Sequence, residues 1–272
     1  MSLRLRPPAV AAKFYPGCAQ ALSRDIEQML ASAPKEFSRR PKAVIVPHAG
    51  YIYSGPIAAS VYARLAGLRD TRDSISRVVL LGPTHRVAIR GVALPSCTGF
   101  ATPLGVVPVD QQAIAALDAL PQVVVDDAAH ADEHSLEVQL PFLQTVLGVF
   151  SLLPLAVGDA SPEEVAEVLE RVWGGAETLI VVSSDLSHYL PYAAAQSSDT
   201  RTARDIVSLA PTLDHQQACG ASPINGLLLA ARRHQLQAET LDLRNSGDTA
   251  GDKARVVGYG AFAFHETESH AH

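Results

Sequence analysis

The sequence has no hydrophobic run long enough to cross a membrane. Its longest apolar stretches, such as residues 179–182 and 227–231, fall far short of the ~20 residues that a spanning helix requires. Residues 1–17 contain basic side chains but no continuous apolar segment of the ~7 to 15 residues typical of a secretory signal. The sequence therefore predicts a soluble protein that stays in the cytoplasm and has no membrane partner.

Cysteine is scarce, since only Cys18, Cys97 and Cys219 occur and they lie far apart in the chain. Three widely spaced cysteines do not form the paired framework of a secreted, disulfide-rich domain. We therefore expect a reducing compartment, in which any functional cysteine acts as a thiol.

No part of the chain is strongly basic. The 22 lysines and arginines are scattered and the net charge is -6, which is not the pattern of a nucleic-acid-binding surface. Repeats, low-complexity tracts and linker-like segments are absent as well, and 47% of the 272 residues are hydrophobic, enough for one large core. We predict a single domain over residues 1–272, with a core at about 12–265 and a flexible tail at 266–272.

Short apolar runs rich in β-branched residues alternate with helix-like segments. This alternation predicts an α/β fold with a mostly parallel central sheet flanked by helices. The expected strands span residues 43–46, 78–81, 152–157, 179–182 and 255–264. The expected helices run from Ser54 or Gly55 to Leu65, over 110–120, 135–147 and 223–234, and from a capping box at Ser161 and Glu164 to about Trp173.

Histidines follow three of these apolar runs. His48 comes just after residues 43–46, His85 comes after 78–81, and Asp185 and His188 come after 179–182. Because the loops at the carboxyl ends of parallel strands form the ligand crevice of such sheets, we expect these side chains to share one pocket. A single loop histidine is more often bonded to backbone, but recurrence at three strand ends favours a site.

Two further positions leave more than one interpretation open. Asp132, Glu133 and Ser135 fit an ordinary helix N-terminus, where acidic groups and a capping hydroxyl are favourable. That explanation does not account for His134, which either belongs to the pocket or lies beside it. Cys219 precedes the helix at 223–234, and this position suits a metal ligand, a nucleophile or simply a small buried residue.

Five segments together resemble the Memo family, whose microbial members are also called component B of the AmmeMemoRadiSam system. In chain order they are PHAGYIYSG (47–55), LGPTH (81–85), DEHSLEVQLPF (132–142), SSDLSHY (183–189) and CGASPI (219–224). The family is similar in fold to the catalytic subunit of class III extradiol dioxygenases, in which two histidines and a carboxylate hold a non-haem iron. The resemblance therefore implies a LigB-like extradiol dioxygenase fold.

The resemblance also implies roles for individual residues. His48 and His85 match the two histidine ligands of the metal, and Cys219 matches the third ligand of Memo-like proteins. His188 matches the acid or base of the dioxygenases, with Asp185 beside it. Because a thiolate is softer than a carboxylate, dioxygenase activity does not follow automatically, and we expect Fe²⁺ with copper or zinc as alternatives.

Aromatic and acidic residues near these motifs are expected to line a substrate pocket. Tyr51 and Tyr53 lie on the predicted loop after the first strand, Phe14 is expected to close another side, and Glu133 precedes His134. Ordinary core packing explains the aromatic residues equally well.

Three functions fit these observations. The first is a redox-active metal protein, or an oxygenase on a small substrate, with His188, Asp185 and His134 as its catalytic groups. The second is a zinc-dependent hydrolase in which Asp185, His188 and Glu133 act on a water molecule. The third is a metal-handling protein without turnover that serves radical-SAM and AMMECR1-type partner proteins. Whether the chain is an enzyme stays open at this stage.

Overall fold

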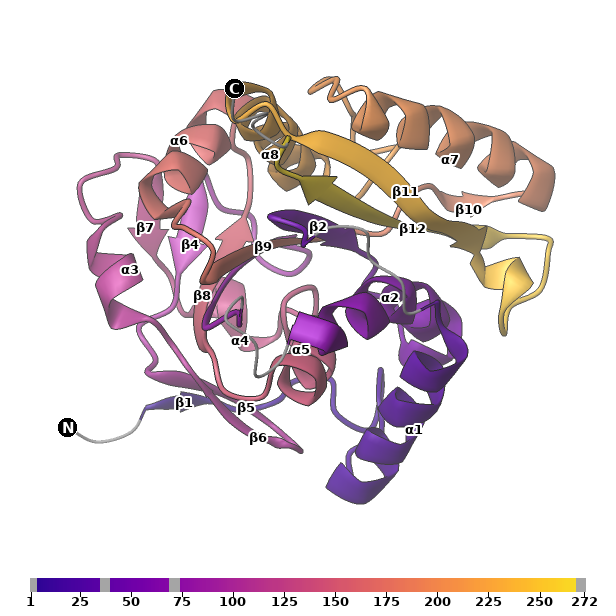
Figure 1. Cartoon of the computed structure of the whole chain (residues 1–272), viewed down its shortest axis with the longest axis horizontal. Coiled ribbons are helices and arrows are strands. Elements are labelled where there is room, and N and C mark those ends of the chain that lie inside the picture. Colours follow the sequence, from indigo (N-terminus) through magenta and orange to yellow (C-terminus); the bar gives the residue numbers. More distant parts are fainter. Residues whose placement is uncertain (1–3, 35–39, 69–73, 268–272) are drawn as a thin grey trace, which may run out of the picture.

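The computed structural model describes residues 4–34, 40–68 and 74–267, and most of its strands belong to one large sheet (Figure 1). Residues 268–272 of the predicted tail lie outside the described residues. Across the sheet the order is β10 (His188–Leu190), β12 (Val256–His265), β2 (Ala43–Val46), β9 (Thr178–Ser183), β3 (Arg77–Pro83), β8 (Ser151–Val157), β4 (Val92–Leu94) and β7 (Val123–Val125). β11 (Gln237–Asn245) also pairs with β12, and β1 (Leu5–Arg6), β5 (Gly99–Thr102) and β6 (Gly105–Pro108) form a separate small sheet.

The centre of the large sheet is parallel and its flanks are antiparallel. β2, β9, β3 and β8 run in the same direction, whereas β12 is antiparallel to β2 and β4 is antiparallel to β8. β11 and β12 are joined without a crossover helix, so they pair as an antiparallel ribbon. The predicted α/β class is confirmed, with a sheet that is mixed.

Helices cover both faces of this sheet. On one side lie α1 (Ala19–Ser32), α2 (Tyr51–Leu65), α5 (Leu140–Leu147) and the short α4 (Ala128–Ala131), and on the other lie α6 (Pro162–Val172), α7 (Tyr192–Val207), α8 (Ala221–Arg233) and the short α3 (Gln111–Ala115) (Figure 1). Successive residues of a strand face opposite sides. Val44 and Val46 accordingly belong to the first core, whereas Ala43 and Ile45 belong to the second.

Several helix boundaries differ from the sequence prediction. α2 begins at Tyr51 rather than Ser54, so Tyr51 and Tyr53 lie on a helix and not on a loop. The segment predicted as one helix over 135–147 is divided into a 3-10 turn (Glu137–Gln139) and α5. Pro141 has no N–H to bond back to the preceding turn, which explains the break. The helix predicted over 110–120 is limited to α3 at Gln111–Ala115.

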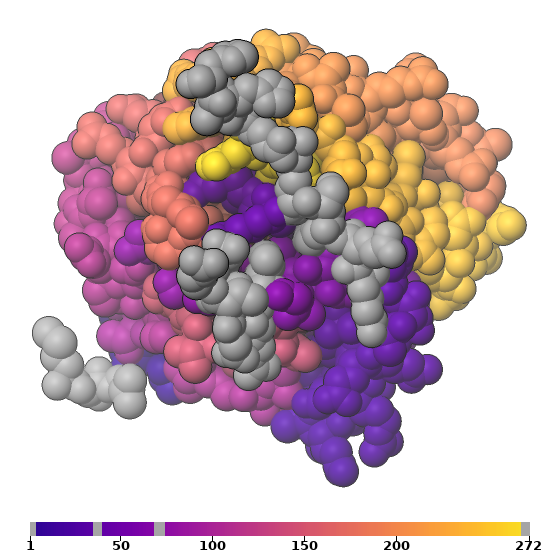
Figure 2. Space-filling model, in the orientation of Figure 1, coloured from indigo at the N-terminus to yellow at the C-terminus, as the bar shows by residue number. Residues whose placement is uncertain are grey.

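The N-terminal and C-terminal quarters of the chain adjoin. Figure 2 shows the indigo N-terminal region against the yellow C-terminal region, in agreement with the packing of α2 on β11 and β12. β12 is inserted beside β2, so the strand that leads to His48 is held in place by the last strand of the chain. Among the described residues, no helix is both long enough and apolar enough to cross a membrane.

Candidate metal centre

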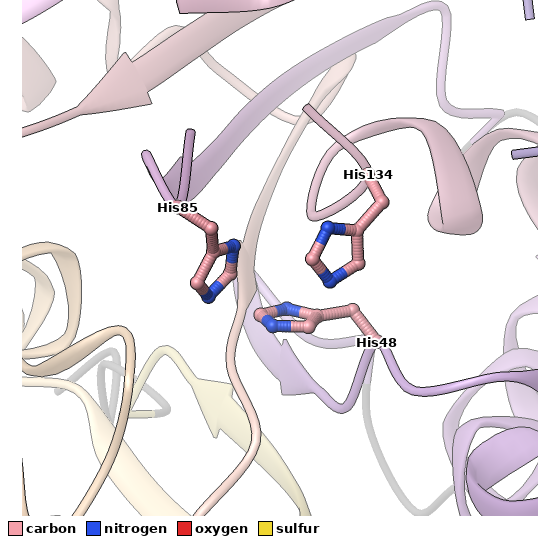
Figure 3. Close-up of side chains that lie close together, drawn as sticks. All are labelled: His48, His85 and His134. Carbon is pink, nitrogen blue, oxygen red and sulfur yellow. The ribbon is translucent and has the colours of Figure 1, made fainter. Parts of the chain in front are cut away.

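Three histidines converge beyond the carboxyl ends of the central strands. His48 follows β2, His85 follows β3, and His134 comes from the loop before α5 (Figure 3). One ring nitrogen from each lies within 4.8 Å of the others. The ring centroids are 5.3 Å apart for His48 and His85, 5.3 Å for His48 and His134, and 4.7 Å for His85 and His134. Such a group of imidazoles is typical of a transition-metal site.

The hydrogen bonds of His48 determine which ring nitrogen faces the centre. The Ser183 hydroxyl donates its only hydrogen to the carbonyl of Ser135 at 2.5 Å, so it must accept from the Nδ1–H of His48 at 2.9 Å. The lone pair of His48 therefore lies on Nε2. Burial lowers the pKa of His48 well below its ordinary value, and the neighbouring histidines lower it further. His48 is thus held neutral, the form that binds a metal.

Glu133 orients His85 in a similar way. One carboxylate oxygen accepts from His85 Nδ1 at 2.9 Å, and the other accepts the backbone N–H of His85 at 2.5 Å. Burial opposes the ionisation of Glu133, but these bonds and the N–H of Ser135 hold its pKa at about 2. Glu133 is therefore charged, and it leaves Nε2 of His85 free to bind a metal. A carboxylate that orients a metal-bound histidine in this manner is common.

His134 is the least satisfied of the three histidines. Its Nδ1 is buried and has no hydrogen-bond partner among the described residues, although it lies 3.3 Å from a Glu133 oxygen. Burial lowers the pKa of His134 to about 4, so its ring is neutral. The ring also contacts Phe14, with centroids 4.8 Å apart. A buried nitrogen without a partner, beside two ligand-ready imidazoles, fits a site built for a cation.

Cys219 approaches the same centre from the side of α8. Its Sγ lies 3.3 Å from Nε2 of His48, close to the ~3.5 Å expected between a sulfur and a nitrogen that bind one tetrahedral ion. Without a metal, burial and, to a smaller extent, the charge of Asp185 raise the pKa of Cys219 to about 12. A bound cation reverses this effect, because a coordinating thiol is deprotonated. Cys219 does not belong to the group formed by the three histidines. The structure therefore offers two candidates for a third ligand beside His48 and His85, namely His134 and Cys219.

Asp185 and His188 have separate surroundings. Asp185 is buried and accepts the backbone N–H of His48 at 2.7 Å, which fixes the loop that carries His48. Burial raises the pKa of Asp185 above its ordinary value. His188 bonds through Nδ1 to the carbonyl of Leu186 at 2.8 Å, which leaves Nε2 without a described partner. His188, His85 and Cys219 together line one cavity of about 960 Å³.

The aromatic residues expected around the substrate lie elsewhere. Phe14, Tyr51 and Tyr53 line a different cavity of about 990 Å³ between α1, α2 and β11, although Phe14 also contacts His134. Tyr51 is buried and donates its hydroxyl hydrogen to the carbonyl of Val138 at 2.8 Å. Neither tyrosine lines the cavity that His85 and Cys219 share.

Sequence reasoning missed Ser183, which accepts a hydrogen bond from His48. It also missed Arg201 and Arg204 of α7, which line the same cavity as His85. Ser183 lies within the motif that carries Asp185 and His188, but a serine at a strand end gives no separate signal. The arginines lie on a segment for which no element was predicted.

Comparison with known proteins gives a consistent result. A family model described as Memo-like protein matches residues 6–263. A MEMO1 family protein of Aquifex aeolicus is 36% identical, covering 94% of this chain and 98% of that protein, and one of Ignicoccus hospitalis is 37% identical, covering 96% and 98%.

Among solved structures, an uncharacterized protein of Escherichia coli K12 has a similar fold. The TM-score is 0.51 at 15% sequence identity, and the match covers 80% of this chain and 98% of the other. At that identity the likeness concerns the fold alone. The near full-length match to the family model and to the two relatives is decisive: this chain belongs to the Memo-like family.

Proposed function

We propose that this protein binds a transition-metal ion through His48 and His85 and uses it to bind and transform a small molecule. The observation that carries the proposal is the orientation of the two imidazoles, whose Nδ1 atoms are occupied by Ser183 and Glu133. Both rings therefore direct Nε2 to the centre. Orienting the buried His48 and the more exposed His85 in this manner, without a ligand between them, has no evident packing advantage.

Cys219 is our preferred third ligand, with His134 as the alternative. The Sγ–Nε2 distance of 3.3 Å to His48 suits shared coordination, and the resemblance to the Memo family supports a cysteine at this position. A thiolate ligand by itself favours copper or zinc. Iron is nevertheless our first choice of metal, because the proposed site resembles the arrangement of the dioxygenases. When bound, such a metal supplies Lewis acidity and, for iron or copper, redox chemistry.

His188 is the residue that we propose for proton transfer. It lines the cavity with His85 and Cys219, and its Nδ1 is held by the carbonyl of Leu186. Its Nε2 is therefore available to take or give a proton. Asp185, by contrast, uses one oxygen to hold the His48 loop, so its role is to position that histidine.

Metal content measured on untagged protein tests the ligand set. We expect about one metal ion per chain in the wild type and loss of that metal in His48→Ala. Cys18→Ser is the matched control for Cys219→Ser, because Cys18 is an exposed free thiol remote from the site. Equal metal content in wild type, His48→Ala and Cys219→Ser would contradict the site.

Cobalt(II) distinguishes the two third ligands. Thiolate coordination gives a sulfur-to-cobalt charge-transfer band in the near ultraviolet, which Cys219→Ser abolishes and His134→Ala leaves in place. Absence of this band from the wild type, together with loss of cobalt binding in His134→Ala, identifies His134 as the ligand. Oxygen uptake by the iron(II)-loaded protein with catechols then tests for oxygenase activity.

A zinc-dependent hydrolase is the second candidate, because Glu133, Asp185 and His188 place two carboxyl groups and an imidazole around the centre. Stoichiometric zinc in protein purified without added metal, together with no oxygen uptake, favours this candidate. A non-catalytic role with radical-SAM and AMMECR1-type partner proteins is favoured if neither reaction is detected.

A further inference from the structure

The cavity above the metal centre has a wall that the proposed metal chemistry does not use. α7 contributes Ser198, Arg201 and Arg204 to this wall, while the loop before α8 contributes residues 214–217. Residues three apart lie on the same side of a helix, so the two arginines and Ser198 form one face of α7. The opposite face of α7 is buried against β11 and β12 through Ala195, Ala203 and other side chains. α7 is therefore fixed, with its arginine face toward the cavity.

Arg201 and Arg204 have no acidic partner among the described residues. Neither guanidinium forms a hydrogen bond or ion pair within the part of the chain that the structure describes, and both side chains are exposed. The two aspartates that line the same cavity are otherwise engaged. Asp214 accepts the backbone N–H groups of Gln216 and Gln217, each at 2.9 Å, and Asp205 accepts from the Gln217 side chain at 3.4 Å.

Arg201 and Arg204 place two guanidinium groups, without an acidic partner among the described residues, at one cavity. The net charge is -6, so acidic side chains outnumber basic ones, and other arginines such as Arg77 and Arg90 do pair with carboxylates. The planar donor fork of arginine matches a carboxylate in a bidentate arrangement. The remaining ionisable groups at the cavity are the histidines His85, His188 and His215 and the thiol of Cys219.

We propose that this cavity selects a small molecule bearing a carboxylate, which Arg201 and Arg204 hold while the other end of the molecule reaches His85 and Cys219. The cavity of about 960 Å³ is large enough for an aromatic or short-chain acid. This inference deepens the proposed function and rests on it for the placement of the reacting end. The arginine contacts themselves do not depend on the identity of the metal.

Binding of a matched pair of probes tests the inference. 3,4-Dihydroxybenzoate and 3,4-dihydroxybenzamide differ in charge but hardly in shape, and zinc-loaded protein avoids oxidation of either. By calorimetry we expect the acid to bind the wild type about tenfold more tightly than the amide, as one charge-assisted contact is lost. Arg201→Gln and Arg204→Gln should each remove most of this preference, while Arg171→Gln, on α6 and outside the cavity, should retain it.

Further arms separate the alternatives. Inorganic phosphate and acetate are added as competitors, and stronger competition by phosphate at equal concentration would overturn the carboxylate assignment. Equal binding of acid and amide, or an unchanged preference in both arginine variants, would overturn the inference as a whole. Metal content is measured on the same samples, and the titrations are repeated without metal. A wild type that binds no metal contradicts the proposed function, whereas the metal-free titrations still decide whether the arginines select the acid.

Discussion

At the scale of single residues, the candidate metal centre depends on side chains, such as Ser183 and Glu133, that orient its histidines. His48 and His85 were identifiable from the sequence because each follows a buried strand, a position with a general structural meaning. The roles of Ser183 and Glu133 were not, because each depends on a partner at least 48 positions away in the chain. Cys219 was assigned by family resemblance, and its contact with His48 now gives that assignment a geometric basis.

Glu133→Gln tests the orientation of His85. A neutral amide is a weaker acceptor for the His85 Nδ1–H, so His85 loses part of its preference for presenting Nε2. We expect metal affinity to fall by about 10- to 100-fold, measured by competition with a chelating dye. Glu239→Gln is the matched control, since Glu239 bonds to His265 away from the site. Equal affinities of the two variants would show that Glu133 does not orient a ligand.

His130 is expected to limit stability in acid. It is buried, its Nε2–H donates to the carbonyl of Ala93 at 2.9 Å, and burial lowers its pKa from 6.5 to about 4. Because the unfolded state takes up a proton below pH 6.5 and the folded state only near pH 4, the contribution of His130 is complete above 6.5 and is lost as the pH falls.

The amide variant His130→Gln retains a donor but does not titrate. Between pH 7.5 and 4.5 we expect the wild type to lose on the order of 2–3 kcal/mol of unfolding free energy relative to this variant, measured by urea denaturation. Parallel pH profiles for the two proteins would assign the acid sensitivity to other groups.

At the scale of secondary-structure elements, strong local signals were interpreted correctly and weak ones were not. α6 was predictable because the Ser161 hydroxyl accepts the N–H of Glu164 and the Glu164 carboxylate accepts the N–H of Ser161, a capping box visible in the sequence. α7 was missed because its buried face includes Asp199 and Thr202 along with alanines, so its apolar periodicity is weak. The arginines of the cavity wall were missed with it.

Ser161→Ala tests the contribution of this cap. Loss of the hydroxyl leaves one N–H at the start of α6 without its partner, so we expect the free energy of unfolding to fall by about 1 kcal/mol in thermal or urea denaturation. The exposed serine of another helix provides a comparison, since Ser32 lies in the last turn of α1 and its loss removes no cap. A Ser161→Ala variant as stable as Ser32→Ala would contradict the expectation.

At the scale of the whole molecule, the sequence predicted the α/β class but not the pairing of every strand. The apolar runs that became β2, β3, β8 and β9 are continuous because both faces of these strands are buried. β4, β7 and β11 are short or partly exposed, and their partners are set by tertiary contacts rather than by local pattern.

Metal binding should stabilise the whole fold, because the proposed ligands lie on the loops after β2 and β3 and on the loop before α8. At a free metal concentration of about 100 times Kd, the folded state gains about 2.7 kcal/mol, which corresponds to a rise in Tm of roughly 5–10 °C. We expect a chelator to reverse the shift and His48→Ala to abolish it, as measured by calorimetry. A similar shift in His48→Ala would mean that the metal binds elsewhere.

The position of β2 has a consequence for how the protein is made. β2 leaves the ribosome early, but both of its neighbours in the sheet, β9 and β12, are synthesised much later, and Cys219 emerges between them. On the growing chain, His48 therefore has neither its strand partners nor its thiol neighbour. On our proposal that His48 and Cys219 hold a metal, the ion would be acquired only after most of the polypeptide has been synthesised.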